Sequence, residues 1–193
     1  MSDDERDDSD GKRGRAVVLD LLPHGRTEDD RPQYQKQPVA FALDTNAFAL
    51  YEMIVADDAD IAIGDYFDIY DADFAERVNE VTYEDLPSGA QSELDYAVED
   101  VVEDEEQRFV DFYNEAQPIT LRLHQLNLLP GIGKKLRNTI LDERERQPFD
   151  SFENLKSRVS GLHNPKETLV ERILEEIKED DLKYRTFVRR DDQ

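Results

Sequence analysis

One short segment, Leu128–Lys135, has the residue types and the spacing to bind an anion. It reads Leu-Leu-Pro-Gly-Ile-Gly-Lys-Lys, so a proline and two glycines come just before two lysines. Proline fixes φ at a turn, whereas glycine permits positive φ and leaves the backbone uncovered. The first amide groups of a following helix have no partner within that helix, and together with the helix dipole they attract negative charge. Lys134 and Lys135 add positive charge beside these amides, and we expect Arg137 to contact a neighbouring phosphate.

The residues on either side of this segment predict two helices joined by a tight turn. Apolar residues at helical spacing would form one stripe on each helix. The stripes consist of Ile119, Leu123 and Leu126 in the first helix and of Leu136, Ile140 and Leu141 in the second. Gly131 and Gly133 permit positive φ in the turn and leave its backbone uncovered, and we expect Ile132 to fill the gap between the helices.

This arrangement resembles the helix-hairpin-helix family, whose pattern is an apolar residue, Pro, Gly, Ile or Val, Gly and then a basic helix start. The resemblance implies that the hairpin binds nucleic acid through its sugar-phosphate backbone, largely independently of base sequence. The residues predicted to form the site are Leu129, Pro130, Gly131, Ile132, Gly133, Lys134, Lys135 and Arg137. The alternative is an ordinary helical hairpin that uses Pro-Gly only to turn.

A second, degenerate copy of the hairpin is predicted further along the chain. A short helix carrying Leu155 would end near Gly161, and Asn164-Pro165 would begin the next helix. This copy lacks the Pro-Gly-x-Gly turn, which leaves its phosphate contacts in doubt. In the basic tail that follows, Tyr184 and Phe187 could stack on bases or could dock the tail on the N-terminal domain.

Charge is distributed unevenly along this 193-residue chain, whose net charge is −23. Residues 1–115 carry 33 acidic and 9 basic residues, whereas residues 116–193 carry 14 acidic and 15 basic residues. Carboxylates keep a surface hydrated in concentrated salt, where the Debye length falls to about 3 Å near 1 M, so the acidity predicts a halophilic protein. Binding of a polyanion would explain the neutral C-terminal part, and ion pairs on helix surfaces are the alternative.

The first half of the chain reads as short strands. Apolar runs separated by turn residues predict five of them, at 16–22, 38–43, 48–55, 66–70 and 78–83. This spacing favours a small antiparallel β-barrel, so the expected fold class is α+β. The predicted parts are a disordered acidic tail at 1–14, the barrel at 15–85, a linking acidic helix at 86–116, the helix-hairpin-helix module at 117–180 and a basic and aromatic tail at 181–193.

From about Ala16 to Val188 the chain is similar to one archaeal family of unknown function. The similarity rests on the order of the parts, on Leu128–Lys135 and on the Glu-Arg-Gln-Pro-Phe segment at 145–149. It implies nucleic-acid binding through a barrel of the OB-fold or Tudor-like type together with the helix-hairpin-helix. Members of the family tend to lie among genes for translation and ribosomal-RNA modification, which favours RNA over DNA and suggests ribosomal or translation proteins as further partners.

An enzyme is not expected from this sequence. Thiol chemistry is excluded because there is no cysteine, and His24, His124 and His163 lack metal-ligand spacing, so each is interpreted as a loop or surface residue. No phosphate-binding loop or dinucleotide motif is present, so no cofactor is predicted. With no apolar run of membrane-spanning length and no secretory signal, we expect a cytoplasmic protein that does not contact membranes. The rival function is that of an adaptor for a basic protein, and the oligomeric state is left open.

Overall fold

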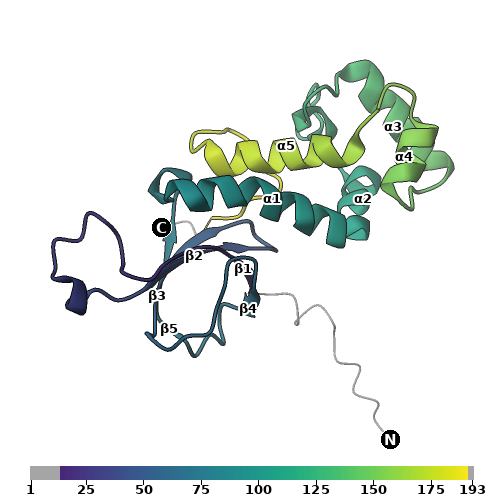
Figure 1. Ribbon diagram of the computed structural model, residues 1–193. Coiled ribbons are helices and arrows are strands. Elements are labelled where there is room, and N and C mark those ends of the chain that lie inside the picture. The colour runs from purple at the N-terminus through teal and green to yellow at the C-terminus, as the bar shows by residue number, and fades with distance from the viewer. Residues whose placement is uncertain (1–13, 191–193) are drawn as a thin grey trace, which may run out of the picture. The chain divides into compact units, whose positions relative to one another are not determined.

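The computed structural model describes residues 14–190, which form two compact units (Figure 1). Within the described residues, one unit comprises residues 14–97 together with Arg189 and Arg190, and the other comprises Val98–Val188. The division falls inside a helix, whereas the sequence placed boundaries at 85/86 and 116/117, and those boundaries stay predictions. The predicted disordered tail lies outside the described residues except for Gly14, which is buried and whose carbonyl accepts a hydrogen bond from the Ile69 amide.

The sheet unit contains five antiparallel strands, and the prediction of an α+β fold is confirmed. The strands are β1 (Arg15–Leu22), β2 (Val39–Asp44), β3 (Leu50–Val55), β4 (Tyr66–Asp68) and β5 (Ala75–Val81). Their order is β4-β1-β2-β3-β5, so β4 and β5 are the two edges. The predicted closed barrel is wrong, because β4 has three residues and pairs with β1 alone, while β5 pairs with β3 alone within the described residues.

Both faces of the central strand β2 are covered. Ala40 and Ala42 belong to an apolar cluster on one face, together with Met53 of β3. Phe41 and Leu43 alternate with these alanines and are also completely buried. Successive residues of a strand point to opposite faces, and both faces of β2 are buried. This explains why β2 is an uninterrupted apolar run from Val39 to Leu43. Against β1 lies the start of the first long helix, where a Cβ on Gly89 would come within 2.6 Å of a carboxylate oxygen of Asp20.

An acidic run at residues 103–106 divides the segment predicted as one linking helix into two helices. Helix α1 (Ser88–Asp104) ends there, and α2 (Glu106–Glu115) begins after Glu105, whose φ of −109° and ψ of 40° are not helical. The apolar stripe continues on both helices through residues that are buried: Val98, Val101 and Val102, then Phe109, Val110 and Tyr113.

Three further α-helices complete the helical unit: α3 (Lys134–Arg146), α4 (Phe152–Arg158) and α5 (Pro165–Lys178). A short 3-10 helix, η4 (Gln125–Leu128), precedes α3, and two others, η2 (Gln33–Gln35) and η3 (Tyr83–Asp85), lie in the sheet unit. Among residues 14–190, none of the helices combines the length and the apolar character needed to cross a lipid bilayer.

Candidate functional site

The predicted hairpin is present at Leu129–Gly133, but the helix predicted before it is not. In place of a helix with Ile119, Leu123 and Leu126 on one face, residues 118–124 form a tight loop closed by a β-bridge between Pro118 and His124. The amides of Ile119 and Thr120 both donate to the Leu123 carbonyl, which commits the backbone to a turn. Only η4, four residues long, precedes the hairpin. The prediction failed because apolar residues four and three residues apart, at 119, 123 and 126, are compatible with this loop as well as with a helix.

Asn127 holds the two sides of the hairpin together. Its side-chain oxygen accepts hydrogen bonds from the His124 amide at 3.1 Å and from the Arg137 guanidinium at 3.1 Å. Its side-chain nitrogen donates to the Ile132 carbonyl at 3.2 Å. One amide therefore links the start of η4, the turn and the first turns of α3, and the sequence analysis did not identify it. The signal available was an asparagine three residues before the proline.

The two glycines of the turn have different roles. Gly131 has a φ of +78°, and the Ile132 amide then donates to the Leu129 carbonyl at 3.2 Å. Gly133 has a φ of −85° and is the N-cap of α3, so it does not use the positive φ that glycine permits. A Cβ on either glycine would have nothing within 4 Å. What Gly133 contributes is therefore an uncovered N-cap with no side chain over the helix start.

The amides at the start of α3 are free to bind a ligand. Gly133 makes no side-chain cap, and the first helical bond runs from the Arg137 amide to the Gly133 carbonyl. Among the described residues, no hydrogen-bond partner is present for the amides of Gly131, Gly133, Lys134, Lys135 and Leu136. The side chains of Lys134 and Lys135 are exposed, and so are both glycines of the turn. Such a helix start combines unpaired donors with the positive end of the dipole, which suits an anion.

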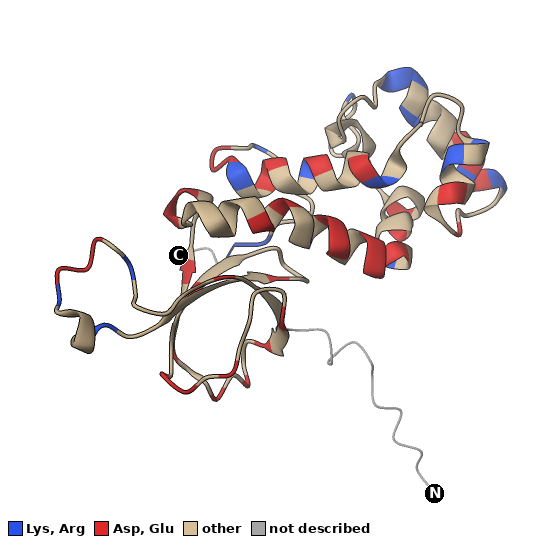
Figure 2. Cartoon of the chain, in the orientation of Figure 1, with Lys and Arg blue, Asp and Glu red and all other residues tan. Residues whose placement is uncertain are grey.

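No carboxylate competes with an anion within this part of the chain. Between Glu115 and Asp142 the sequence contains no aspartate or glutamate, although the whole chain has 47. The four cations of this segment are Arg122, Lys134, Lys135 and Arg137. None of them forms an ion pair within residues 14–190, and Arg137 bonds only the neutral amides of Asn127 and Asn138. In Figure 2 the ribbon at the start of α3 is accordingly blue.

The structure separates the eight predicted site residues into two groups. Gly131, Gly133, Lys134 and Lys135 are exposed and adjacent, and Arg137 and Pro130 are half-buried beside them. Leu129 and Ile132 are 1% and 4% exposed, so they belong to the core that supports the turn. Burial of Ile132 agrees with its predicted role of filling the gap.

The second hairpin is present as α4, a turn at 159–164 and α5, but its charges differ from those of the first. Gly161 has a φ of +96°. Lys166 at the start of α5 lies 3.4 Å from carboxylate oxygens of both Glu99 and Glu103, and Glu167 follows in the same first turn. These carboxylates oppose an approaching anion, so the start of α5 is less suited to an anion than the start of α3 is.

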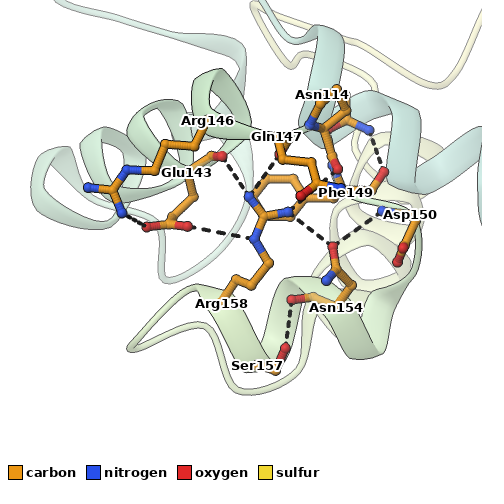
Figure 3. A network of polar contacts seen from close by, with 10 residues as sticks. Asn114, Glu143, Arg146, Gln147, Phe149, Asp150, Asn154, Ser157 and Arg158 are labelled. Atoms are coloured by element: carbon orange, nitrogen blue, oxygen red, sulfur yellow. Dashed lines mark hydrogen bonds and ion pairs between the residues drawn. The ribbon is translucent and has the colours of Figure 1, made fainter.

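Arg158 fastens the second hairpin to the end of α3 (Figure 3). Its guanidinium donates to the carbonyls of Glu143 at 2.7 Å and Gln147 at 2.8 Å, and it stacks on the Phe149 ring at 4.6 Å. Asn114 of α2 bonds the Phe149 backbone in both directions, at 2.7 and 2.9 Å. Two carbonyls at the C-terminus of α3 thus have a cationic partner, which fixes the helix whose other end carries the free amides.

The basic and aromatic tail is docked on the helical unit. The Phe187 ring centroid lies 4.9 Å from that of Phe112 and 6.4 Å from that of Phe109. The buried Glu176 carboxylate accepts the amides of residues 186–188. Of the two predicted roles, docking is observed: residues 184–188 contact α2 and α5, and the Arg189 amide donates to the Ala47 carbonyl of the sheet unit at 2.9 Å. Stacking of Tyr184 and Phe187 on bases stays a prediction.

One of the three histidines that were interpreted as loop or surface residues is buried. His124 is 5% exposed, and its Nδ1 accepts a hydrogen bond from the Leu126 amide at 3.1 Å, which caps η4. Burial, followed by the charges of Arg144 and Arg137, lowers the pKa of His124. His24 and His163 are exposed, as predicted. Within the part of the chain that is described, no group of three histidine or acidic side chains could hold a metal ion.

Comparison with known proteins places the chain in a family. Residues 13–189 match the model of a family described as protein of unknown function (DUF655). The chain belongs to this family. An uncharacterised protein of Methanocaldococcus jannaschii is 39% identical over 178 residues, which cover 90% of this chain and 79% of that protein. A crystal structure of a DUF655 protein from Archaeoglobus fulgidus has a TM-score of 0.82 at 36% identity and covers 91% of this chain and 99% of that chain. The predicted membership of an archaeal family of unknown function is confirmed, and nucleic-acid binding stays a prediction.

Proposed function

We propose that this DUF655 protein binds the sugar-phosphate backbone of nucleic acid, without catalysis, at the turn Leu129–Gly133 and the first turn of α3. The observation that carries the proposal is the set of unpaired amides at Gly131 and residues 133–136, beside two lysines with no carboxylate partner in the described chain. A phosphate oxygen would accept from these amides while Lys134 and Lys135 contribute charge.

The geometry favours recognition of the backbone over recognition of bases. Amides and lysine side chains at a helix start contact phosphate oxygens, which are the same at every nucleotide. The absence of a side chain at Gly133 permits the close approach that an amide donor requires. The short η4 departs from the helix-hairpin-helix pattern, but the groups that would bind phosphate belong to the turn and to α3.

We propose RNA as the preferred polymer, following the genomic association that the family resemblance implies. An OB-fold or Tudor-like relationship of the open sheet is part of the same proposal, without a ligand assigned to the sheet unit. Because the chain carries a net charge of −23, binding is to be measured in about 1 M KCl, where long-range repulsion is screened.

The first test reverses the charge of the two lysines. We expect Lys134→Glu/Lys135→Glu to weaken binding of labelled RNA and DNA by about 100-fold, since two charge-assisted contacts of about 1.5 kcal/mol each are lost. Lys156→Glu/Lys183→Glu is the matched control, because it changes net charge equally at two other exposed lysines of the helical unit. Fluorescence anisotropy gives the affinities, and equal losses in both double variants would contradict a site at the hairpin.

The second test fills the N-cap. An N-cap side chain reaches the second and third amides of its helix, so Gly133→Asp would occupy the proposed site with a carboxylate. We expect this variant to be at least as stable as the wild type, because Asp is a better N-cap than Gly by a few tenths of a kcal/mol, and yet to lose detectable binding. Gly133→Ala adds only a methyl group and should bind more weakly than the wild type but more tightly than Gly133→Asp.

The adaptor function makes the opposite prediction for these variants. If the wild-type protein binds neither RNA nor DNA in molar KCl, or if Gly133→Asp binds as tightly as the wild type, the hairpin is not a phosphate site. Retention of a basic ribosomal protein under the same conditions would then favour the adaptor.

A further inference from the structure

Leu121 is an unusual residue on the surface of the helical unit. Its side chain is 107% exposed, which makes it the most exposed large apolar residue in the described chain. The other exposed large apolar side chains all lie between residues 34 and 96: Tyr34, Ile63, Tyr66, Tyr70, Val78 and Tyr96. Leu121 also lies within the segment between Glu115 and Asp142 that contains no acidic residue.

The loop that presents Leu121 is held in one conformation. The Thr120 hydroxyl oxygen, before the tip, accepts hydrogen bonds from the amides of Arg122 at 3.3 Å and Leu123 at 3.0 Å, after the tip. The Ile119 and Thr120 amides donate to the Leu123 carbonyl at 2.8 and 3.0 Å. Because these bonds order the backbone already, a ligand that contacts Leu121 does not have to order the loop.

The tip lies close to the proposed phosphate site. Leu121 is three residues before His124, so their Cα atoms are at most about 11 Å apart. The His124 amide and the Arg137 guanidinium share one acceptor, the side-chain oxygen of Asn127. A strand rises about 3.4 Å per nucleotide in a helix, so a bound strand could reach from α3 to Leu121 within a few nucleotides. Arg122, exposed beside Leu121, has no ion pair within residues 14–190.

We propose that Leu121 and Arg122 extend the nucleic-acid interface, with the Leu121 side chain lying against the face of an unpaired base and Arg122 contacting the adjacent phosphate. This inference rests on the proposed function of the hairpin. It adds a substrate class to that function: strands or loops with accessible bases, in preference to a fully paired duplex.

The preference for unpaired bases follows from whether the apolar faces of the bases are accessible to a side chain. In a duplex the base faces are stacked, and a side chain must separate them, at a cost, before it can cover one. Single-stranded segments present base faces that can be covered without this cost. Leu121 is one aliphatic side chain, and the hairpin beside it contributes only a few phosphate contacts, so the interface gains most from a strand whose bases are already free.

The test compares Leu121→Ser with the wild type on two probes of equal length, an unstructured 20-nucleotide RNA and a fully paired RNA duplex. We expect the serine variant to bind the single strand about tenfold more weakly and the duplex less than about twofold more weakly. Leu121→Phe keeps an apolar side chain at this position and should bind the single strand as tightly as the wild type does. Ile63→Ser is the matched control, an exposed aliphatic residue of the sheet unit, and should change neither affinity. Melting temperatures report that each variant is folded.

The outcomes separate this inference from the proposed function. If Lys134→Glu/Lys135→Glu weakens binding and Leu121→Ser does not, the hairpin binds phosphate and the Leu121 contact is refuted. If the lysine pair has no effect on either probe, the proposed function and this inference fail together. Equal losses on both probes would refute the preference for unpaired bases. Self-association that Leu121→Ser abolishes, with unchanged affinity for RNA, would assign Leu121 to a contact between copies and overturn the proposal.

Discussion

The buried carboxylate of Glu176 makes the strongest prediction about what holds the helical unit together. Its side chain is 0% exposed. One oxygen accepts the Thr186 amide at 2.8 Å and the Nε of Arg172 at 3.1 Å, and the other accepts the amides of Phe187 at 2.8 Å and Val188 at 3.0 Å. Four donors therefore converge on one carboxylate group, and Glu176→Gln changes that group with almost no change in shape.

The magnitude follows from the positions of the donors. Glutamine has one oxygen and one NH2 group, so in either orientation two of the four donors face another donor. Two lost charge-assisted hydrogen bonds cost about 3–6 kcal/mol. The Arg172 side chain, which is 8% exposed, also loses the charge of its buried partner, and breaking a buried pair costs about 3–5 kcal/mol by itself. These costs overlap because they describe the same contacts, so we expect a loss of about 4 kcal/mol in the free energy of unfolding.

Urea and thermal unfolding in molar KCl, followed by circular dichroism, measure this loss. A chain of this size changes its melting temperature by about 2–4 °C per kcal/mol, so the expected decrease is about 8–16 °C. Glu175→Gln is the matched control. It makes the same chemical change one residue earlier, where the carboxylate is 46% exposed and bonds the same Arg172 at 3.0 Å, and we expect it to cost less than about 1 kcal/mol. Equal effects of the two substitutions, or a loss below about 1 kcal/mol for Glu176→Gln, would refute the reasoning.

Two smaller predictions concern the hairpin. His124 has a lowered pKa in the folded protein, so its contribution to stability is present above its unfolded pKa of about 6.5 and is lost as pH falls below that value. His124→Asn keeps an acceptor for the Leu126 amide, and urea unfolding at pH 7.0 and 5.5 should show a smaller loss on acidification than in the wild type; an identical loss would exclude His124 as the source. Gly131→Ala, at a φ of +78°, should cost about 1–2 kcal/mol in urea unfolding, whereas Gly133→Ala, at −85°, should cost less than about 0.5 kcal/mol, and equal costs would contradict the assignment of roles.

Local patterns predicted the strands well, and pairing over long distances was where prediction failed. Strands β1, β2 and β3 are apolar runs bounded by turn residues, and both signals lie within a few positions of each other. Strand β5 is mostly polar and exposed, and it begins at Ala75, three residues before the predicted start. Closure of a barrel depends instead on whether the first and last edges meet. Residues 66–70 were predicted as a strand, but only Tyr66–Asp68 pair, so this edge is too short to continue the sheet.

At the candidate site the turn and the second helix were predictable, because proline, glycine and the lysines act locally. The missing first helix was not, since the apolar spacing at 119, 123 and 126 suits a helix and the Thr120 hydroxyl redirects the backbone. The buried pair of Arg172 and Glu176 was also missed, because an arginine and a glutamate four residues apart usually lie on a helix surface. Their signal was position: they lie three and seven residues after the buried Leu169, on the face that packs.

The distribution of charge links the acidity of the chain to the proposed site. At about 1 M salt the Debye length is about 3 Å, so distant carboxylates have little effect on a bound phosphate and only groups in direct contact matter. A carboxylate beside the hairpin would still matter there, because it would bond the free amides of α3 or pair with Lys134 and Lys135. Residues 116–141 contain no such group. If acidic residues were spread evenly, one would also be expected near the start of α3, as Glu167 is found in the first turn of α5. A general preference for acidic surface residues would not explain why residues 116–141 lack them. A requirement that an anion reach the amides of α3, as proposed above, would explain it.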